Sequence, residues 1–157
     1  MIIDADGINN LSTNIDILYK KKAPLILTPH TVEFSRMTGL TPCHIEENRL
    51  EEALSFAKKY DVILVLKGAD TIIASPDGKA YISAIANSGL ATAGSGDVLS
   101  GIIAGFLAQG ASPFTAAAAG VYAHSLSGLK AVNKLGERSM TASDIISNLP
   151  EVLKEIK

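Results

Sequence analysis

The sequence predicts an α/β fold with a mostly parallel sheet, on three observations. Short continuous apolar runs at 25–27 and 62–66 are typical of strands that are buried on both faces. Between these runs, apolar side chains recur at helical spacing over 45–57. From residue 97 onward the pattern is helical and rich in alanine and glycine, which permits close packing of helices over a sheet. Strand, helix and strand in this order predict a parallel crossover unit.

The N-terminal half supplies a second, similar unit. Ile2-Ile3 predicts the end of a buried strand, and a weak helix is expected over 15–19. The helix over 45–59 has glutamates at its front and lysines at its back, which suits the helix dipole. Because a buried parallel strand stands at the very start of the chain, we expect upstream sequence to be missing.

The C-terminal half changes pattern twice. Pro-Asp-Gly at 76–78 is turn chemistry, so the flanking runs 71–75 and 79–82 are predicted to be short antiparallel strands. Helices are then expected over 98–109, 113–134 and 141–148.

Composition is that of one globular domain. The chain has 157 residues, of which 47% are hydrophobic and 19% charged, with a single cysteine, Cys43. The formal net charge of −2 comes from 14 basic and 16 acidic residues with no basic block, so we expect no nucleic-acid partner and no membrane partner. No apolar run approaches the roughly 18 residues that span a bilayer. A lone cysteine requires no oxidising compartment, and we expect a cytoplasmic protein.

A small-residue loop that runs into an apolar helix, within 89–103, gives the sharpest functional pattern. Gly94, Ser95 and Gly96 leave backbone amides uncovered at a helix N-terminus, which favours an anion such as phosphate. Asp97 would then be able to accept a proton from a hydroxyl that attacks phosphorus. The alternative is simple capping, with Ser95 or Asp97 bonding the helix amides. The loop matches neither the Walker motif nor the dinucleotide fingerprint.

A second polar cluster, Lys67-Gly-Ala-Asp-Thr71, follows the strand at 62–66. Open α/β sheets bind ligands at this end of their strands. Lys67 can reach a phosphate, Gly68 permits close approach, and Thr71 adds a hydroxyl. The alternative is a turn between strands with a solvated lysine.

A third cluster, Thr28-Pro-His-Thr-Val-Glu-Phe34, places His30 and Glu33 about one helical turn apart. His30 suits a polar ligand, and Glu33 suits a magnesium-bound water. The alternative is a capping arrangement in which Thr28 or Thr31 is the cap and Glu33 returns to it. Polar residues at several strand ends, Asp4 and Asp6 included, together predict a nucleotide and phosphate site.

Two other histidines lie outside these clusters. His124 falls on an apolar helix, where a packing histidine with its hydrogen bonds satisfied is expected. His44 precedes an acidic helix and is expected on the surface.

Four motifs together resemble the ADP/ATP-dependent NAD(P)H-hydrate dehydratases of the ribokinase-like superfamily. They are Asp4-Ala-Asp-Gly-Ile-Asn9, the 28–34 cluster, the 67–71 cluster and the 89–103 loop. The resemblance implies a ribokinase-like three-layer α/β/α fold whose N-terminal part is missing. Residues 1–157 would then be the C-terminal portion of the catalytic domain.

The resemblance also implies a reaction: hydrated NADH or NADPH is dehydrated to NAD(P)H by phosphorylation of the ring hydroxyl and elimination. ADP or ATP is the implied co-substrate and Mg²⁺ the implied cofactor. The implied general base and substrate contact is Asp97, the anion hole is Gly94, Ser95 and Gly96, and further substrate contacts are His30 and Asn9. The implied nucleotide contacts are Lys67, Gly68, Ala69, Asp70, Thr71 and Gly96. Glu33 takes the place of the acidic residue that holds magnesium indirectly, through water, but it is preceded by His30 where sugar kinases often have asparagine.

Two other functions remain open on the sequence alone. A ribokinase-like kinase of a hydroxymethylpyrimidine or a sugar would use the same anion hole and base. A non-catalytic nucleotide-binding fragment would need a partner. Because a partial domain leaves a sheet edge at Ile2-Ile3 and an uncovered apolar surface, we expect either a shortened chain or a homo-oligomer.

Overall fold

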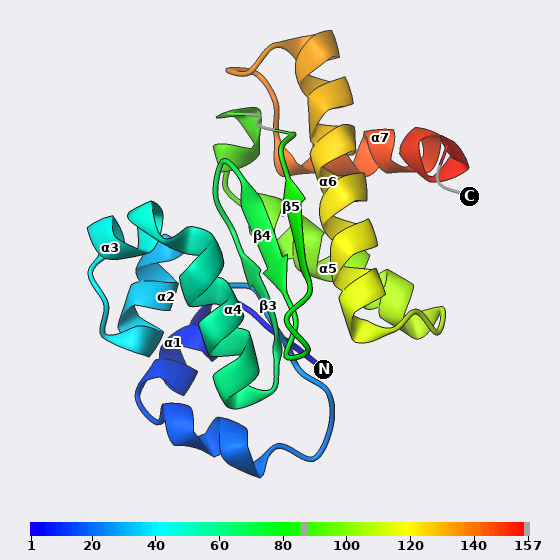
Figure 1. Cartoon of the computed structure of the whole chain (residues 1–157). Helices are drawn as coiled ribbons and strands as arrows, with labels where there is room; N and C mark the ends of the chain where they lie inside the picture. The colour runs from blue at the N-terminus through cyan, green and yellow to red at the C-terminus, as the bar shows by residue number, and fades with distance from the viewer. Residues whose placement is uncertain (86–87, 156–157) are drawn as a thin grey trace.

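A five-stranded sheet lies between two layers of helices in the computed structural model, which describes residues 1–85 and 88–155 (Figure 1). The strands, in spatial order, are β1 (Ile2–Ile3), β2 (Ile26–Leu27), β3 (Ile63–Leu66), β4 (Thr71–Ala74) and β5 (Ala80–Ser83). β1, β2 and β3 pair in parallel, whereas β4 and β5 are antiparallel to their neighbours. The α/β prediction is confirmed, including the hairpin after β3 and the position of β1 at the edge of the described sheet.

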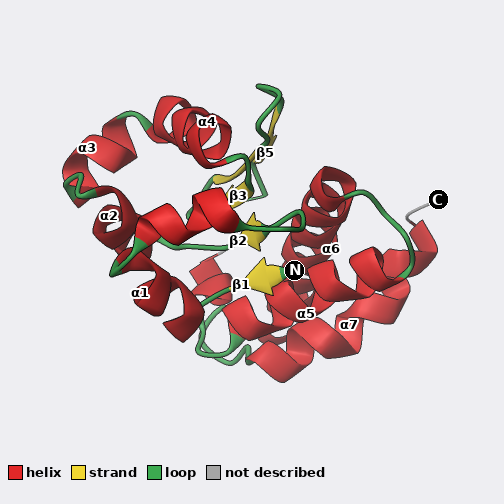
Figure 2. Cartoon of the chain, turned by 90° about the horizontal axis from the view of Figure 1, so that it is seen from below, coloured by secondary structure: helices red, strands yellow, loops and turns green. Residues whose placement is uncertain are grey.

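One layer contains the helices of the N-terminal half (Figure 2). They are α1 (Asp6–Ser12), the 3-10 helix η1 (Ile15–Lys20), α2 (Thr31–Thr38), α3 (Pro42–Glu47) and α4 (Arg49–Tyr60). Their apolar side chains surround Leu64 and Leu66 of β3. The rings of Phe34 and Phe56 pack edge to face, with their centroids 5.2 Å apart.

The other layer contains the helices of the C-terminal half. They are η2 (Ser88–Ala91), α5 (Ser95–Ala108), α6 (Pro113–Leu135) and α7 (Ala142–Glu155). Successive side chains of β3 point to opposite faces of the sheet. Val65 therefore packs among the apolar side chains between the sheet and this second layer, whereas Leu64 and Leu66 pack against the first layer. A side chain at Gly120 would lie 3.2 Å from Ile103 Cα, so this glycine lets α6 pack closely on α5.

Two predicted helices differ from those observed. The helix expected over 45–59 is interrupted at Asn48, which separates α3 from α4 and whose side-chain amide donates to the His44 carbonyl at 3.0 Å. Leu50 consequently lies on the outer face and is 40% exposed. α7 continues through Pro150 to Glu155, past the expected end at 148.

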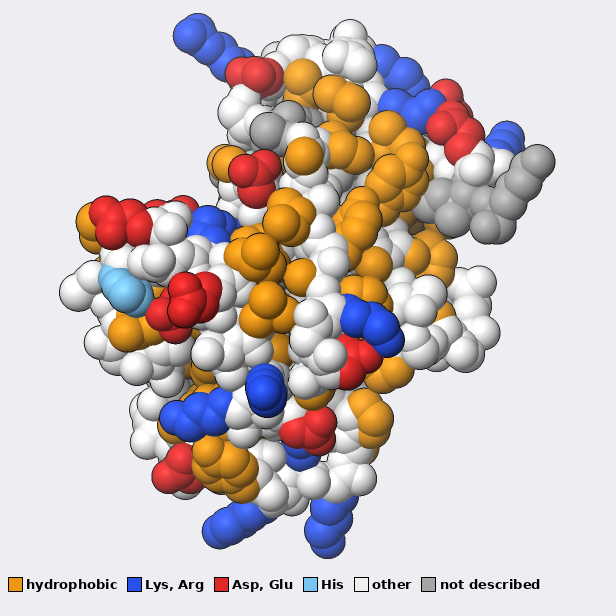
Figure 3. Space-filling model, in the orientation of Figure 1, with side chains coloured by type: hydrophobic (Ala, Val, Ile, Leu, Met, Phe, Trp, Pro, Cys, Tyr) orange, Lys and Arg blue, Asp and Glu red, His pale blue; other side chains and the backbone are white. Residues whose placement is uncertain are grey.

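Hydrophobic side chains gather on the face formed by β5 and α6 (Figure 3). Exposed apolar residues of these two elements include Ile82, Tyr122 and Leu135. Within 1–85 and 88–155, none of the helices combines the length and apolar character needed to cross a membrane.

Candidate functional site

A cleft of about 830 Å³ opens beyond the carboxyl ends of β2 and β3. The turns after these strands lie side by side, because His30 and Lys67 form a parallel bridge. The polar and glycine residues that line the cleft are His30, Thr31, Lys67, Gly68, Thr71, Ser83, Ser88, Thr92, Ser95, Gly96, His124 and Ser125. The cleft thus brings together residues of three predicted clusters, which lie more than 60 residues apart at their extremes.

An ion pair links the ends of β1 and β3 next to the cleft. Lys67 Nζ lies 2.9 Å from Asp4 Oδ1, and Ser100 Oγ donates to Asp4 Oδ2 at 2.8 Å. Burial alone would raise the pKa of Asp4, but the bond to Lys67 and its charge lower it. A side chain at Gly96 would lie 3.4 Å from Lys67 Nζ and 3.8 Å from Asp4 Oδ2. The first turn of α5 therefore lies directly against this ion pair.

The start of α5 has no side-chain cap among the described residues. Its N-cap is Gly94, with φ of 83°, and neither Ser95 nor Asp97 bonds back as a cap. The alternative in which Ser95 or Asp97 caps the helix by bonding its amides is therefore wrong. The Ser95 amide donates to the Thr92 carbonyl at 3.3 Å, so the helix dipole and the other amides of the first turn leave this helix start suited to an anion.

Ser95 is buried against His124 of α6. His124 Nε2 lies 3.0 Å from the Ser95 carbonyl oxygen and 3.1 Å from Ser95 Oγ. Burial lowers the pKa of His124 to about 4, the Ser95 carbonyl opposes this shift, and the charge of Lys67 adds to it. Because a carbonyl can only accept, the neutral ring carries its proton on Nε2 and donates to Ser95. The packing histidine expected here is confirmed, but nothing in the sequence indicated its bond to the glycine-rich loop.

His30 is itself the N-cap of α2. Its Nδ1 accepts from the amides of Val32 at 3.1 Å and Glu33 at 3.3 Å, while Glu33 Oε2 accepts from the His30 amide at 2.8 Å. This is a capping box, but the cap is His30 and not Thr28 or Thr31. Thr28 is buried and donates to the Ile3 carbonyl instead. Since Nδ1 accepts, a ring proton lies on Nε2, which is 3.6 Å from Glu33 Oε2. The His30 side chain also lines the cleft.

Arg49, at the start of α4, is a residue that the sequence reasoning missed. Its Nη2 donates to the carbonyls of Leu66 and Lys67, each at 3.1 Å. The space beside Gly68, which the sequence assigned to an approaching ligand, contains the Arg49 guanidinium. A lone arginine on an amphipathic helix carries no pattern that would have revealed this contact.

Several predicted site residues lie outside the cleft. Asp97 is exposed and lines a second cavity of about 680 Å³ between α5 and α7, among apolar side chains such as Ile102, Phe106 and Leu153. Because Gly96 lines the cleft and Asp97 the second cavity, the first turn of α5 separates the two. Asn9 lies on α1, where its Oδ1 accepts from Arg36 Nη1 at 2.8 Å. The residues recorded as lining these two cavities include none of Asn9, Glu33, Asp70 and Gly94.

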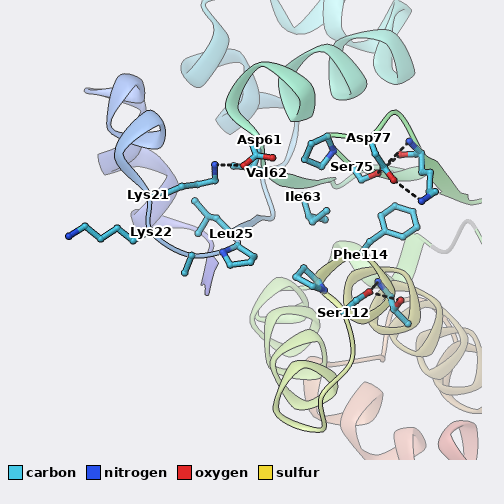
Figure 4. Close-up of a pocket in the computed structure, with 16 residues that line it drawn as sticks. Lys21, Lys22, Leu25, Asp61, Val62, Ile63, Ser75, Asp77, Ser112 and Phe114 are labelled. Atoms are coloured by element: carbon cyan, nitrogen blue, oxygen red, sulfur yellow. Dashed lines mark hydrogen bonds and ion pairs between the residues drawn. The ribbon is translucent and has the colours of Figure 1, made fainter.

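A third cavity, of about 710 Å³, lies at the amino ends of β2 and β3 (Figure 4). Its charged groups pair with one another: Lys21 Nζ lies 2.9 Å from Asp61, and Lys79 Nζ lies 2.6 Å from Asp77. This cavity holds none of the clusters that predicted a phosphate site.

The described part of the chain contains no cluster of three or more His, Cys, Asp or Glu side chains able to hold a metal ion. Glu33 is a single buried carboxylate, and one of its oxygens accepts the His30 amide. Magnesium keeps several waters and binds through one or two carboxylates plus phosphates. Within the described residues, a magnesium ion would therefore have to be held mainly by water and by the nucleotide.

Comparisons with known proteins agree with one another. A family model described as NAD(P)H-hydrate dehydratase matches residues 1–151. The chain is 47% identical over 156 residues to the bifunctional NAD(P)H-hydrate repair enzyme Nnr of Moorella thermoacetica, covering 99% of the chain and 29% of that enzyme. It is 43% identical over 126 residues to the ADP-dependent (S)-NAD(P)H-hydrate dehydratase of Neisseria meningitidis, covering 79% of the chain and 43% of that enzyme.

A solved structure matches along the same length. The ADP/ATP-dependent NAD(P)H-hydrate dehydratase of Bacillus subtilis, co-crystallised with ATP and Mg²⁺, superposes with a TM-score of 0.86 at 32% identity. The match covers 99% of this chain and 55% of that one. The chain thus spans between about a third and about a half of the relatives it matches, and the ribokinase-like fold is confirmed.

Proposed function

Since this chain belongs to the NAD(P)H-hydrate dehydratase family, we propose that it takes part in the adenine-nucleotide-dependent dehydration of hydrated NADH and NADPH back to NADH and NADPH. The observation that carries the proposal is the uncapped start of α5, which lies against Lys67 and lines the same cleft. In this proposal residues 1–157 are the C-terminal portion of a longer catalytic domain. The partial coverage of the relatives supports that assignment.

The nucleotide is assigned to the cleft beyond β3. Lys67, Gly68, Ala69 and Thr71 line one wall, and Ser95 with Gly96 line the other. The terminal phosphate then meets the first amides of α5, the anion hole of Gly94, Ser95 and Gly96. Asp70 belongs to the same turn through its backbone, although its side chain is exposed. A volume of about 830 Å³ is within the range of small-molecule sites.

Asp97 is the proposed general base, on the other side of the same helical turn. It accepts the proton of the ring hydroxyl while the hydroxyl oxygen forms a bond to the terminal phosphorus of the nucleotide, and the bridging P–O bond breaks. The shortened nucleotide leaves. In the second step the ring C–O bond breaks, phosphate departs, and the neighbouring carbon loses a proton. The ring double bond is restored without any net oxidation or reduction.

The remaining contacts complete the proposal. His30, which lines the cleft, is assigned to the hydrated dinucleotide, as is Asn9. Glu33 is assigned to the magnesium shell through water. A bound Mg²⁺ supplies charge neutralisation to the phosphates. Cytoplasmic location is kept as a prediction.

Self-association belongs to the same proposal. The edge strand β1 and the exposed apolar side chains of β5 and α6 support a homo-oligomer. Light scattering of the purified chain checks this: a mass near twice or more that of one chain is expected, and a monomer at all concentrations contradicts it.

The deciding experiment is recovery of NADH absorbance from hydrated NADH. We expect recovery with Mg²⁺ and ADP or ATP, with one phosphate released for each NADH formed, and none when the nucleotide is omitted. Parallel assays with the two nucleotides give the preferred phosphoryl donor. A folded chain that restores no NADH with either nucleotide contradicts the proposal.

A further inference from the structure

The turn that follows β3 is held from its outer side by one guanidinium group. Arg49 Nη2 donates to the carbonyls of Leu66 and Lys67 at 3.1 Å, and the Asp70 carbonyl lies 3.4 Å from the same nitrogen. The Arg49 side chain is only 13% exposed. Three carbonyls of a single turn therefore converge on one buried cationic group, and the bonds are charge-assisted.

The other end of the guanidinium contacts the start of α2, which also lines the cleft. Arg49 Nη1 donates to Thr31 Oγ1 at 3.1 Å and forms an ion pair with Glu46 at 3.0 Å. Thr31 directly follows His30, and both line the cleft. Arg49 thus links the turn after β3 to the start of α2, without lining the cleft itself.

Gly68 is fitted to Arg49. A side chain at this position would lie 2.8 Å from Arg49 Cζ and 3.1 Å from Nη1. Gly68 is outside the positive-φ region, so alanine is compatible with its backbone conformation. The glycine is required because the guanidinium occupies the space of a side chain.

We propose that Arg49 is the positioning residue that sets the affinity of the turn 67–71 for the adenine nucleotide, an inference that rests on the proposed function. The Nη1 and Nη2 groups of the planar guanidinium reach both turns at once. A lysine at this position keeps the charge but offers a single ammonium nitrogen on a flexible stem. The carbonyls of the turn would lose their fixed partner, and the turn would bind the nucleotide less well.

The first test is Arg49→Lys in the full chain, with ADP affinity measured by calorimetry. We expect Kd for ADP to rise about tenfold or more, and in the NADH-recovery assay KM for ADP to rise while kcat at saturating ADP changes little. Arg138→Lys, the same chemical change at an exposed arginine, is the matched control and should leave both constants unchanged. A merely structural arginine would lower the amount of folded protein without separating KM from kcat.

The second test uses Gly68→Ala, which keeps every donor of Arg49 but displaces the guanidinium. ADP affinity should fall in the same direction, with circular dichroism unchanged. The double variant Gly68→Ala/Arg49→Lys should bind ADP no more weakly than the weaker single variant, because both changes act on one contact. If Arg49→Lys does not fold, Gly68→Ala alone decides, and an unchanged Kd overturns the inference.

The outcomes separate the two proposals. If the unchanged chain binds no ADP, the proposed function fails and this inference fails with it. If the unchanged chain binds ADP and Arg49→Lys binds it equally well, only the role of Arg49 is overturned. Fully additive losses in the double variant overturn it as well.

Discussion

The two ends of the sheet both have a cavity and charged side chains, yet these side chains are connected differently. At the amino end, Lys21 pairs with Asp61 and Lys79 with Asp77, and both aspartates are more than half exposed. At the carboxyl end, Lys67 pairs with Asp4 across 63 residues of sequence, and both side chains are largely buried.

The difference shows that cavity size does not identify a site in this protein. The two cavities differ little in volume, at about 710 and about 830 Å³. Only the carboxyl end combines an uncapped helix start, a buried ion pair and a histidine kept neutral by burial. Interactions between distant elements fix these groups in place, as a binding site requires.

The largest expected effect is on catalysis, from Asp97→Asn. Removal of the proposed base should lower kcat by about 10²–10⁴ while ADP affinity stays close to its original value, because only proton acceptance is lost. Asp16→Asn, at an exposed carboxylate on η1, is the control. Steady-state kinetics and calorimetry together check the prediction, and near-normal turnover in Asp97→Asn contradicts the assigned role.

The next effect is on stability, through His124. Its pKa is lowered to about 4 in the folded chain, so between pH 6.5 and 4 the unfolded chain binds more protons than the folded one. Stability should therefore fall as pH falls through this window, by about 3 kcal/mol over its whole width. Urea unfolding at a series of pH values measures this slope.

His124→Gln should remove most of that slope, whereas His44→Gln, at an exposed histidine, should keep it. An equal slope in His124→Gln and in the unchanged chain would exclude His124 as the source.

A smaller effect is expected from Asp4→Asn. The change leaves Lys67 without its partner in a largely buried position, and we expect a loss of about 2 kcal/mol, below the range for fully buried pairs. The lowered pKa of Asp4 gives the sign of the pH dependence: its contribution is present above the ordinary carboxylate range and is lost as pH falls through the folded pKa. Chemical unfolding near neutral pH checks the size, and a loss that persists unchanged in strong acid would contradict the assignment.

Features that depend on local sequence could be predicted before the structure was known. The strands, the hairpin and the glycine-rich loop were predictable, because apolar runs, Pro-Asp-Gly and Gly-Ser-Gly act locally. Asp97 and Lys67 are predictable from the small-residue loop and from the end of a buried strand, and the family resemblance implies the same roles.

The partners of these residues were not predictable. Arg49 hydrogen-bonds to carbonyls that lie 17 to 21 residues away in sequence. His124 contacts Ser95 across 29 residues, and Lys67 pairs with Asp4 across 63 residues. Such contacts depend on how the layers pack against the sheet, which residue type and spacing do not encode. Asn48 shows the same limit on a smaller scale, since a single side-chain bond to His44 accompanies the break in a helix that periodicity predicts as continuous.

The smallest effect is expected at the amino end, from Asp77→Asn. Lys79 and then Ser75 lower the pKa of Asp77 to about 2, but the side chain is 54% exposed, where water and salt screen the charge. Asparagine keeps an oxygen that accepts from Ser75. Stability near neutral pH and ADP affinity should therefore both stay within experimental error of the unchanged chain. If Asp77→Asn lowered ADP affinity as much as Asp4→Asn does, the two ends of the sheet would be functionally coupled, and the contrast between pairs with exposed carboxylates and the largely buried pair of Lys67 and Asp4 would not hold.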